Sequence, residues 1–160
     1  MNDNSPIWKP HATVAAVIEK DQRFLMVEEN IDGVNCINQP AGHLESGESL
    51  VTAVVRECLE ETAWIVQPDY LIGIYRWQLA DSEQTYLRFT FAAHAREQQI
   101  HQPLDNDIIA AHWLSYKQLA SGKYSLRSPM VLRCIDDYLS GQEYSLSLLR
   151  DIEITENNVN

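Results

Sequence analysis

The segment from Leu50 to Thr62 constrains the fold of this chain more than any other part of the sequence. Its apolar residues Leu50, Val54 and Cys58 recur every four positions, which is the period of an amphipathic α-helix. Ser49 stands immediately before the first of them and is a favoured N-cap residue. The pattern therefore predicts a helix over residues 50–62 with its apolar side turned inward.

Three glutamates lie on the other side of this predicted helix. Glu57, Glu60 and Glu61 have the spacing i, i+3 and i+4, so their side chains share an arc of about 100°. Such a group is usually a solvated helix face. Here the like charges repel one another, and the helix dipole disfavours anions near the C-terminus. A segment that breaks two local rules often marks a functional site, and grouped carboxylates suit Mg²⁺ or Mn²⁺.

The length and composition indicate one domain with its own core. The chain has 160 residues, and 45% of them are apolar, so we expect a single domain over residues 1–160, with the acidic residues 151–160 as a loose tail. The three cysteines Cys36, Cys58 and Cys134 are an odd number at wide spacing. They fit reduced thiols rather than a disulfide framework.

The net charge limits the partners of the protein. Lys and Arg number 12 and Asp and Glu 23, which gives a net charge of −11 and disfavours binding to nucleic acid or to an anionic membrane. Residues 1–6 carry no basic and apolar leader, and the apolar run 12–18 is too short to span a bilayer. We expect a soluble, cytoplasmic protein in which an anionic substrate would need a divalent cation.

Other patterns predict strands and a second helix. Branched and aromatic residues bounded by polar turns indicate two hairpins and a short strand, and a Ser-Pro start followed by a Gly stop indicates a helix. The predicted elements are a hairpin of 12–18 with 24–27, a hairpin of 70–78 with 86–95 around residues 80–83, a strand at 111–114, and a helix capped by Ser128 that begins at Pro129 and ends before Gly141.

The spacing of Gly, Glu and Arg residues around the first predicted helix resembles the Nudix box of pyrophosphate-cleaving hydrolases. Gly42 is followed after five residues by Glu48, and after seven more by the run Arg56-Glu57-Cys58-Leu59-Glu60-Glu61. Stretches 9–11, 38–45, 87–89 and 126–129 are similar to the bacterial phosphatase NudJ subfamily, and the resemblance extends to about Leu146. It implies an α/β fold, an α/β/α sandwich with a mixed β-sheet and a loop–helix–loop Nudix motif.

The resemblance also implies an activity. Members of this subfamily hydrolyse phosphoanhydride bonds with Mg²⁺, and they release orthophosphate from nucleoside tri- and diphosphates and from thiamin-pathway diphosphates such as hydroxymethylpyrimidine diphosphate. The partner would then be a small nucleotide or pyrimidine diphosphate, and the protein a monomer or homodimer. Two alternatives stay open: an enzyme for another anhydride, such as ADP-ribose or a dinucleoside polyphosphate, and a non-catalytic nucleotide-binding domain.

Carried over position by position, the resemblance gives roles to the box residues. Glu57, Glu60 and Glu61 would bind Mg²⁺, with Mn²⁺ as a substitute, and Glu57 is alternatively the base that activates water. Arg56 would brace a carboxylate, and Glu48 would have a structural role. Two further assignments are open: Gly42 either offers its carbonyl to the metal or is a simple turn residue, and an extra acidic ligand would be Asp105 or Asp107.

Further candidates come from the chemistry of phosphates and rings. Cationic side chains bind phosphate oxygens, and aromatic rings stack on bases. The candidates for substrate binding are Arg88, Arg127, Lys9, Arg23 and Trp77, with Tyr75 on the same strand face as Trp77 and with His11 and His43 flanking the site in sequence.

One box position departs from the family pattern. The box usually ends with Gly followed by an apolar residue, but this chain has Ala63 and Trp64. If residue 63 is left-handed, alanine costs roughly 1 to 2 kcal/mol. We therefore predict either a strained backbone at Ala63 or a shifted helix end, with the glutamates unaffected.

Overall fold

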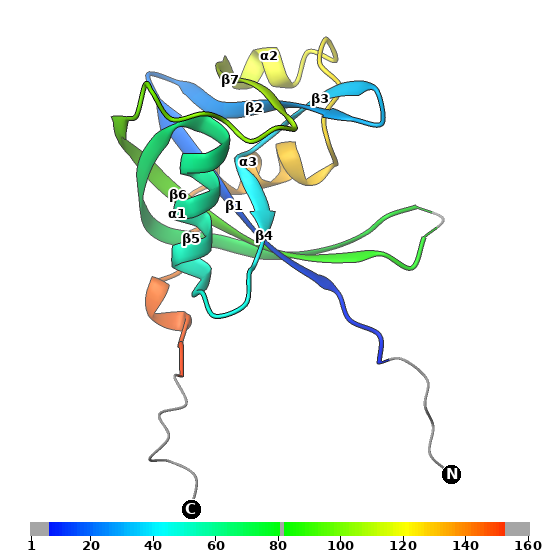
Figure 1. Ribbon diagram of the computed structural model, residues 1–160, viewed down its shortest axis with the longest axis vertical. Helices are drawn as coiled ribbons and strands as arrows, with labels where there is room; N and C mark the ends of the chain where they lie inside the picture. Colours follow the sequence, from blue (N-terminus) through cyan, green and yellow to red (C-terminus); the bar gives the residue numbers. More distant parts are fainter. Residues whose placement is uncertain (1–6, 81, 153–160) are drawn as a thin grey trace, which may run out of the picture.

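The computed structural model of the protein describes residues 7–80 and 82–152. In chain order the elements are β1 (His11–Lys20), β2 (Arg23–Ile31), β3 (Val34–Asn38), β4 (Ala41–His43), α1 (Leu50–Thr62), β5 (Trp64–Gln78), β6 (Thr85–Gln98), β7 (Ile108–Ser115), α2 (Tyr116–Leu119), α3 (Met130–Leu139) and the 3-10 helix η1 (Leu146–Leu148) (Figure 1). The predicted tail from residue 153 onward and position 81 of the second predicted turn lie outside the described residues.

The strands form one mixed sheet in the order β3-β2-β1-β6-β5. The pair β1 and β6 is parallel, whereas β1–β2, β2–β3 and β5–β6 are antiparallel. Both predicted hairpins are confirmed, and each strand of the second one is longer than expected. Residues 111–114 also form the predicted strand, within β7, which pairs with β2.

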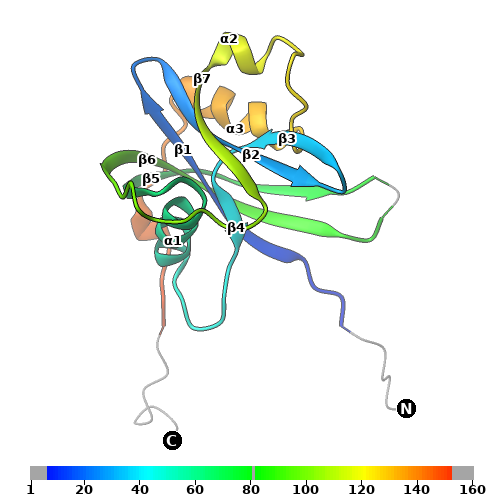
Figure 2. The same ribbon diagram turned by 45° about the horizontal axis from the view of Figure 1, so that its top comes forward.

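Strand β1 changes its partner along its length. Its first half, at 13–15, pairs with β4, whereas only Glu19 and Lys20 at its far end pair with β2. The short strand β4 therefore lies beside β1 apart from the layer of β2, β3 and β7 (Figure 2). The separation leaves room for a cavity between β4 and β2.

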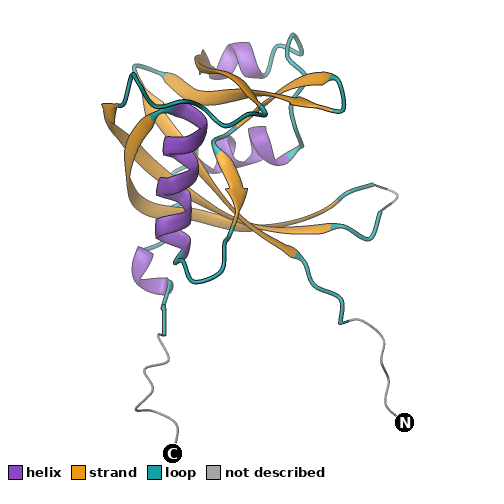
Figure 3. Cartoon of the chain, viewed as in Figure 1, coloured by secondary structure: helices purple, strands orange, loops and turns teal. Residues whose placement is uncertain are grey.

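Two apolar cores lie on the two faces of the sheet. Successive residues of β1 alternate between them: Val14, Ala16 and Ile18 pack in the cluster that includes residues of α1, and Val17 packs in the cluster that includes residues of α3. Helices α1 and α3 thus cover opposite faces (Figure 3). This arrangement confirms the predicted α/β/α sandwich and explains why residues 14–18 of β1 are all apolar.

Helix α1 has the predicted bounds and the predicted strain. The Ser49 side chain accepts a hydrogen bond from the backbone N of Thr52 at 3.0 Å. At the other end Ala63 is left-handed, with φ 59° and ψ 19°. Its N–H donates to the carbonyl of Leu59 at 2.9 Å, and its carbonyl accepts from Gln99 at 2.7 Å, so the chain holds this conformation although residue 63 has a Cβ.

The second predicted helix begins one residue later than expected. Pro129 is the N-cap of α3 rather than its first helical residue, and the Ser128 hydroxyl accepts from the backbone N of Met130 at 3.3 Å. Gly141 follows the helix with φ 80°, as its C-terminal position predicted. Among the described residues, no helix combines the length and the apolar character needed to cross a membrane.

Candidate active site

Helix α1 turns two of its three site glutamates toward β4. Glu57 and Glu61 are 7% and 8% exposed, and the backbone N of Ala41 donates to Glu61 Oε2 at 2.8 Å. A Cβ at Gly42 would overlap the Glu57 carboxylate. Glycine at position 42 is therefore needed to admit the carboxylate, beyond any requirement of the turn.

Arg56 connects four groups around these glutamates. Its Nη1 donates to Glu57 Oε1 at 2.8 Å and to Glu60 Oε2 at 2.9 Å. Its Nε and Nη2 donate to the two carboxylate oxygens of Glu48 at 3.1 and 2.7 Å, and Nη2 also donates to the carbonyl of His43 at 3.0 Å. The brace that the sequence predicted is present, and it holds Glu57 and Glu48 in addition to Glu60.

Burial sets the protonation of these acids. Burial raises the pKa of Glu57, although Arg56 opposes the shift. Burial raises the pKa of Glu61 to about 9, against the hydrogen bond from Ala41. The pKa of Glu48 is lowered, chiefly by its hydrogen bonds from Arg56. Burial thus favours the neutral form of Glu61.

The donor set fits a hard divalent cation in chemistry. All candidate ligands are oxygens, from Glu57, Glu60, Glu61 and the Gly42 carbonyl, which is the set that Mg²⁺ and Mn²⁺ prefer. In the described part of the chain, no three His, Cys, Asp or Glu side chains converge closely enough to hold a metal as they stand. Arg56 Nη1 bridges Glu57 and Glu60, so the guanidinium neutralises two of the charges that a metal ion would neutralise.

A cavity of about 300 Å³ opens beside Gly42. Its lining combines cations, acids and flat rings from β1 to β6 and from the start of α3. The lining residues are Thr13, Glu29, Asn38, Ala41, Gly42, His43, Trp77, Tyr86, Arg88, Asp107, Arg127, Ser128 and Met130. The cavity thus lies between β4 and β2, where β1 changes partner.

Two of the four predicted phosphate-binding cations reach this cavity. Arg88 lines it, is 7% exposed, and has no hydrogen-bond partner for Nε and Nη1 within the described residues. Arg127 lines it too, with Nε 3.6 Å from Glu29 Oε1. A buried, unpartnered guanidinium is costly unless a ligand supplies its counter-charge, and desolvation correspondingly lowers the pKa of Arg88.

The other two predicted cations are corrected by the structure. Arg23 does not line the cavity: it begins β2, at the end remote from Glu29, and its Nη1 donates to the carbonyl of Trp113 and to Gln118 Oε1 at 3.2 and 3.4 Å. Lys9 is exposed ahead of β1 and is not among the lining residues. Lys9, Arg23 and Arg88 are all basic, so residue type alone could not separate them. Which cation faces the cavity depends on its place in the sheet.

Aromatic and histidine side chains border the cavity. Trp77 stacks on Tyr86 with ring centroids 5.6 Å apart, and Tyr86 stacks on His11 at 5.2 Å. His43 Nε2 lies 3.3 Å from His11 Nδ1. Of the two candidate acids in the downstream loop, Asp107 lines the cavity. Asp105 does not line the cavity, but its backbone N–H donates to the carbonyl of Glu60 at 3.0 Å, and its charge contributes to the raised pKa of Glu57 and of Glu61.

Three polar residues of the cavity have no place in the sequence prediction. Thr13, Glu29 and Asn38 all line it, and burial raises the pKa of Glu29 against opposing effects of Arg127 and Asn38. One signal in the sequence indicated Glu29. It lies two residues after Val27, the last residue of the apolar run 24–27, and so on the same side of the strand as this buried residue.

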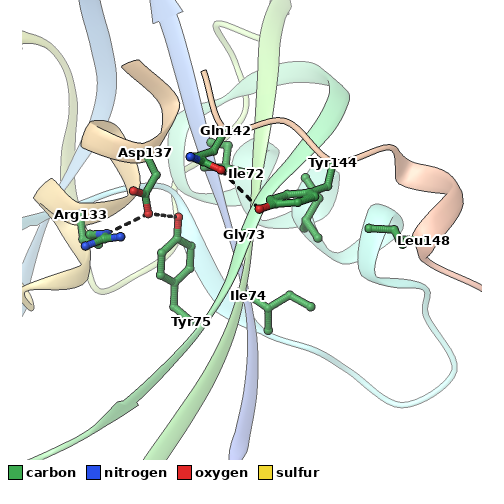
Figure 4. A pocket seen from close by; sticks show the side chains of 10 residues that line it. Ile72, Gly73, Ile74, Tyr75, Arg133, Asp137, Gln142, Tyr144 and Leu148 are labelled. Atoms are coloured by element: carbon green, nitrogen blue, oxygen red, sulfur yellow. Dashed lines mark hydrogen bonds and ion pairs between the residues drawn. The ribbon is translucent and has the colours of Figure 1, made fainter. Parts of the chain in front are cut away.

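A larger cavity of about 680 Å³ lies elsewhere, between the edge strand β5, α3 and the segment before η1 (Figure 4). There the Tyr75 hydroxyl donates to Asp137 Oδ2 at 2.9 Å, and Arg133 Nε donates to the same oxygen at 2.9 Å. The α1 glutamates line neither cavity, but Ala41 and Gly42, which contact Glu61 and Glu57, line the smaller one. We therefore place the candidate site there. Tyr75 therefore does not share a site with Trp77, although both lie on one strand.

Known proteins resemble this chain over most of its length. The family model described as the NUDIX domain matches residues 9–133. Phosphatase NudJ of Escherichia coli (strain K12) is 42% identical over 145 residues, which cover 91% of this chain and 94% of that protein. The solved structure of a NUDIX hydrolase from Nitrosomonas europaea is 43% identical, with a TM-score of 0.89 over 92% of this chain and 100% of that chain.

A more distant structure shares the fold alone. The NUDIX domain of Shewanella oneidensis NrtR, solved in complex with ADP ribose, is 17% identical with a TM-score of 0.65, over 83% of this chain and 88% of that chain.

Proposed function

Because the chain belongs to the Nudix hydrolase family, as its box residues predicted, we propose that it is a Mg²⁺-dependent phosphatase that releases orthophosphate from nucleoside tri- and diphosphates and from pyrimidine diphosphates of thiamin synthesis. The family supports phosphoanhydride hydrolysis in general. The 42% identity to Phosphatase NudJ over 91% of the chain supports the narrower activity.

One observation carries the proposal. Two buried carboxylates, Glu57 and Glu61, contact Gly42 and Ala41, which line the cavity, and the buried Arg88 lines the same cavity with no hydrogen-bond partner for Nε and Nη1 among the described residues. A site with acids on one side and an unpartnered cation on the other suits an anionic substrate bridged to a metal ion. The guanidinium would lose its cost of burial when a phosphate oxygen accepts its N–H groups.

Each residue then has a physical role. Glu57, Glu60 and Glu61 would hold Mg²⁺ together with the Gly42 carbonyl. When bound, the ion would neutralise phosphate charge and make a water molecule more acidic. Arg88 and Arg127 bind phosphate oxygens, and Trp77 provides a flat wall for the ring.

The proton from the attacking water needs a carboxylate acceptor. We propose that Glu57, which contacts the cavity residue Gly42, or Asp107, which lines the cavity, accepts it. Arg56 stays a positioning residue, since its contacts are to carboxylates and to a backbone carbonyl. We further propose that residues 1–160 form one domain, because both cores share one sheet.

The size of the cavity favours a substrate with one heterocyclic base. A volume of about 300 Å³ lies at the small end of the range for ligand sites. It accommodates one base with a short phosphate chain more readily than the two nucleosides of a dinucleoside polyphosphate. Another anhydride such as ADP-ribose is the alternative substrate, and a non-catalytic nucleotide-binding domain is the alternative function.

A substrate panel tests the proposal. Nucleoside tri- and diphosphates, hydroxymethylpyrimidine diphosphate, thiamin diphosphate and ADP-ribose are incubated with Mg²⁺ or with chelator, and orthophosphate is separated from pyrophosphate. We expect orthophosphate, and only with the metal. Pyrophosphate from a triphosphate would contradict the NudJ-like activity, and turnover that Glu60→Gln leaves unchanged would contradict the assignment of this site.

A further inference from the structure

The cavity beside Gly42 contains nearly all the unpartnered polar atoms that the described residues bury. Six buried side-chain atoms have no hydrogen-bond partner in this part of the chain. Five of the six belong to residues that line the cavity, namely Thr13, Glu29, Asn38 and Arg88. Because native proteins satisfy most buried polar groups, such a concentration at one cavity indicates that a ligand completes these hydrogen bonds.

The unpartnered atoms include two hydrogen-bond acceptors, on two neighbouring strands, whose residues both line the cavity. Glu29 Oε1 comes from β2, and Asn38 Oδ1 comes from the end of β3. Arg127 Nε lies 3.6 Å from Glu29 Oε1, which is beyond hydrogen-bond reach. A carboxylate oxygen and an amide oxygen can only accept, so the complementary group on a ligand is an N–H donor.

Local geometry aims Glu29 into the cavity and its neighbour out of it. The pairing of β2 with β7 shifts register between Glu28 and Glu29, and such bulges redirect side chains beside active sites. Glu28 is satisfied on the other side of the strand, by His112 Nε2 at 2.9 Å and Asn35 Nδ2 at 3.1 Å. Of these two consecutive glutamates, only Glu29 lines the cavity. Its Oε1 forms an ion pair with Arg127 at 3.6 Å but accepts no hydrogen bond from the described residues.

The same cavity has a flat wall. Trp77 and Tyr86 line it, and their rings stack with an interplanar angle of 26°. An aromatic wall beside a polar edge suits a planar heterocycle, whose face packs on the rings while its edge forms hydrogen bonds.

We propose that Glu29, together with Asn38, is the specificity-determining pair that selects substrates whose ring carries an amino donor at its edge. The inference rests on the proposed function, since it assumes that the substrate binds in this cavity. Cytosine presents an amino group at ring position 4, whereas uracil presents a carbonyl oxygen there. The carbonyl would meet these acceptors without a donor. Uracil offers this edge only the single N–H of position 3, whereas the amino group of cytosine offers two N–H donors, so at least one of Glu29 Oε1 and Asn38 Oδ1 stays unsatisfied with uracil.

Cytidine and uridine diphosphate test the inference, because they differ only at that edge. Orthophosphate release with Mg²⁺ is measured for both, and for inorganic pyrophosphate, which has no ring. We expect the wild-type protein to prefer cytidine diphosphate by about tenfold or more in kcat/KM. Glu29→Gln keeps the side-chain volume but adds an N–H donor, so the preference should fall to within about threefold. The matched control Glu28→Gln should keep the wild-type ratio.

The possible results distinguish a failure of the inferred specificity from a failure of the proposed function. Equal kcat/KM for the two nucleotides in the wild-type protein, or an unchanged ratio in Glu29→Gln, would overturn this inference alone. No Mg²⁺-dependent hydrolysis of any of the three compounds would overturn the proposed function and the inference with it. Melting curves establish that the variants fold. If Glu29→Gln does not, Asn38→Leu replaces it, and a wild-type ratio in that variant counts against the pair.

Discussion

The carboxylate of Glu57 occupies the space beside the α-carbon of Gly42 that a side chain at position 42 would fill. Helix α1, which carries the acids, and strand β4, which borders the cavity, thus pack closely at Glu57 and Gly42. The position of Glu57 depends on this contact as well as on its hydrogen bond from Arg56.

Gly42→Ala should damage metal binding and activity more than stability. The added methyl group displaces the Glu57 carboxylate, and a shift of about 1 Å at a catalytic group can cost on the order of 100-fold in rate. Mg²⁺ activation curves and melting temperatures measure the two effects. Gly73→Ala is the matched control, because its Cβ meets only the Tyr75 ring, at the larger cavity, and it should leave Mg²⁺ activation unchanged. Wild-type activation in Gly42→Ala would contradict the account.

Arg56→Lys should lower activity although it keeps the charge. Lysine cannot reproduce the paired hydrogen bonds to Glu48 together with the bridge between Glu57 and Glu60. Since carboxylates that support a metal site lose about 10- to 100-fold in affinity or activity when their own partners are removed, we expect a loss of that order in kcat and a weaker Mg²⁺ activation. Substrate KM should change little, and a variant that changes KM alone would argue for direct contact between Arg56 and substrate.

The stability of the metal-free protein should respond to pH through Glu61. Its pKa is about 9 in the folded protein against an ordinary value of 4.5, so the folded state retains a proton that the unfolded state releases above pH 4.5. This contribution to stability is present at low pH and is lost as pH rises toward 9, by at most about 1.4 kcal/mol per pH unit. Glu61→Gln cannot ionise and should become more stable than the wild type as pH rises.

Chemical denaturation between pH 5 and 9, with chelator, measures this difference. Exposed Glu143→Gln is the control and should follow the wild type. Parallel pH profiles for the wild type and Glu61→Gln would show that Glu61 ionises normally. Added Mg²⁺ should narrow the difference at high pH, because it supplies the buried carboxylate with a counter-ion.

Ala63→Gly should stabilise the protein without altering the site. Ala63 has φ 59°, a conformation that glycine adopts without the steric cost of a Cβ. After the greater flexibility of glycine in the unfolded state is subtracted, we expect a gain of about 0.5 to 1 kcal/mol. Ala120→Gly is the control, since the exposed Ala120 has φ −79° and should lose stability instead. A loss of stability in both variants would refute strain at residue 63.

The sequence predicted the parts of the site that lie on one helix. The bounds of α1, its Ser49 cap and the grouping of Glu57 and Glu61 follow from local spacing. Alanine at position 63 predicted either backbone strain or a shifted helix end, and the residue is left-handed with the helix end unshifted. The strand side of the site was less accessible to such reasoning. Arg23 and Arg88 are alike as residue types, yet only Arg88 lines the cavity.

The cavity residues Glu29 and Asn38 were missed for a related reason. The two residues lie on neighbouring strands, because β2 pairs with β3 with Val27 opposite Asn38. They line a cavity because β1 pairs with β4 over one part of its length and with β2 over another, and because β2 bulges beside Glu29. Both features are long-range properties of strand pairing, which hydrophobic periodicity does not encode.

The central claim is that Glu57, Glu60 and Glu61 bind a hard divalent cation. Titration of the metal-free protein with Mn²⁺, followed by the paramagnetic resonance of free Mn²⁺ and by calorimetry, measures this directly in the wild type, in Glu60→Gln and in the control Glu143→Gln. We expect saturable binding in the wild type and the control, and affinity weaker by about tenfold or more in Glu60→Gln. Equal affinity in all three proteins, or no saturable binding in the wild type, would contradict the account.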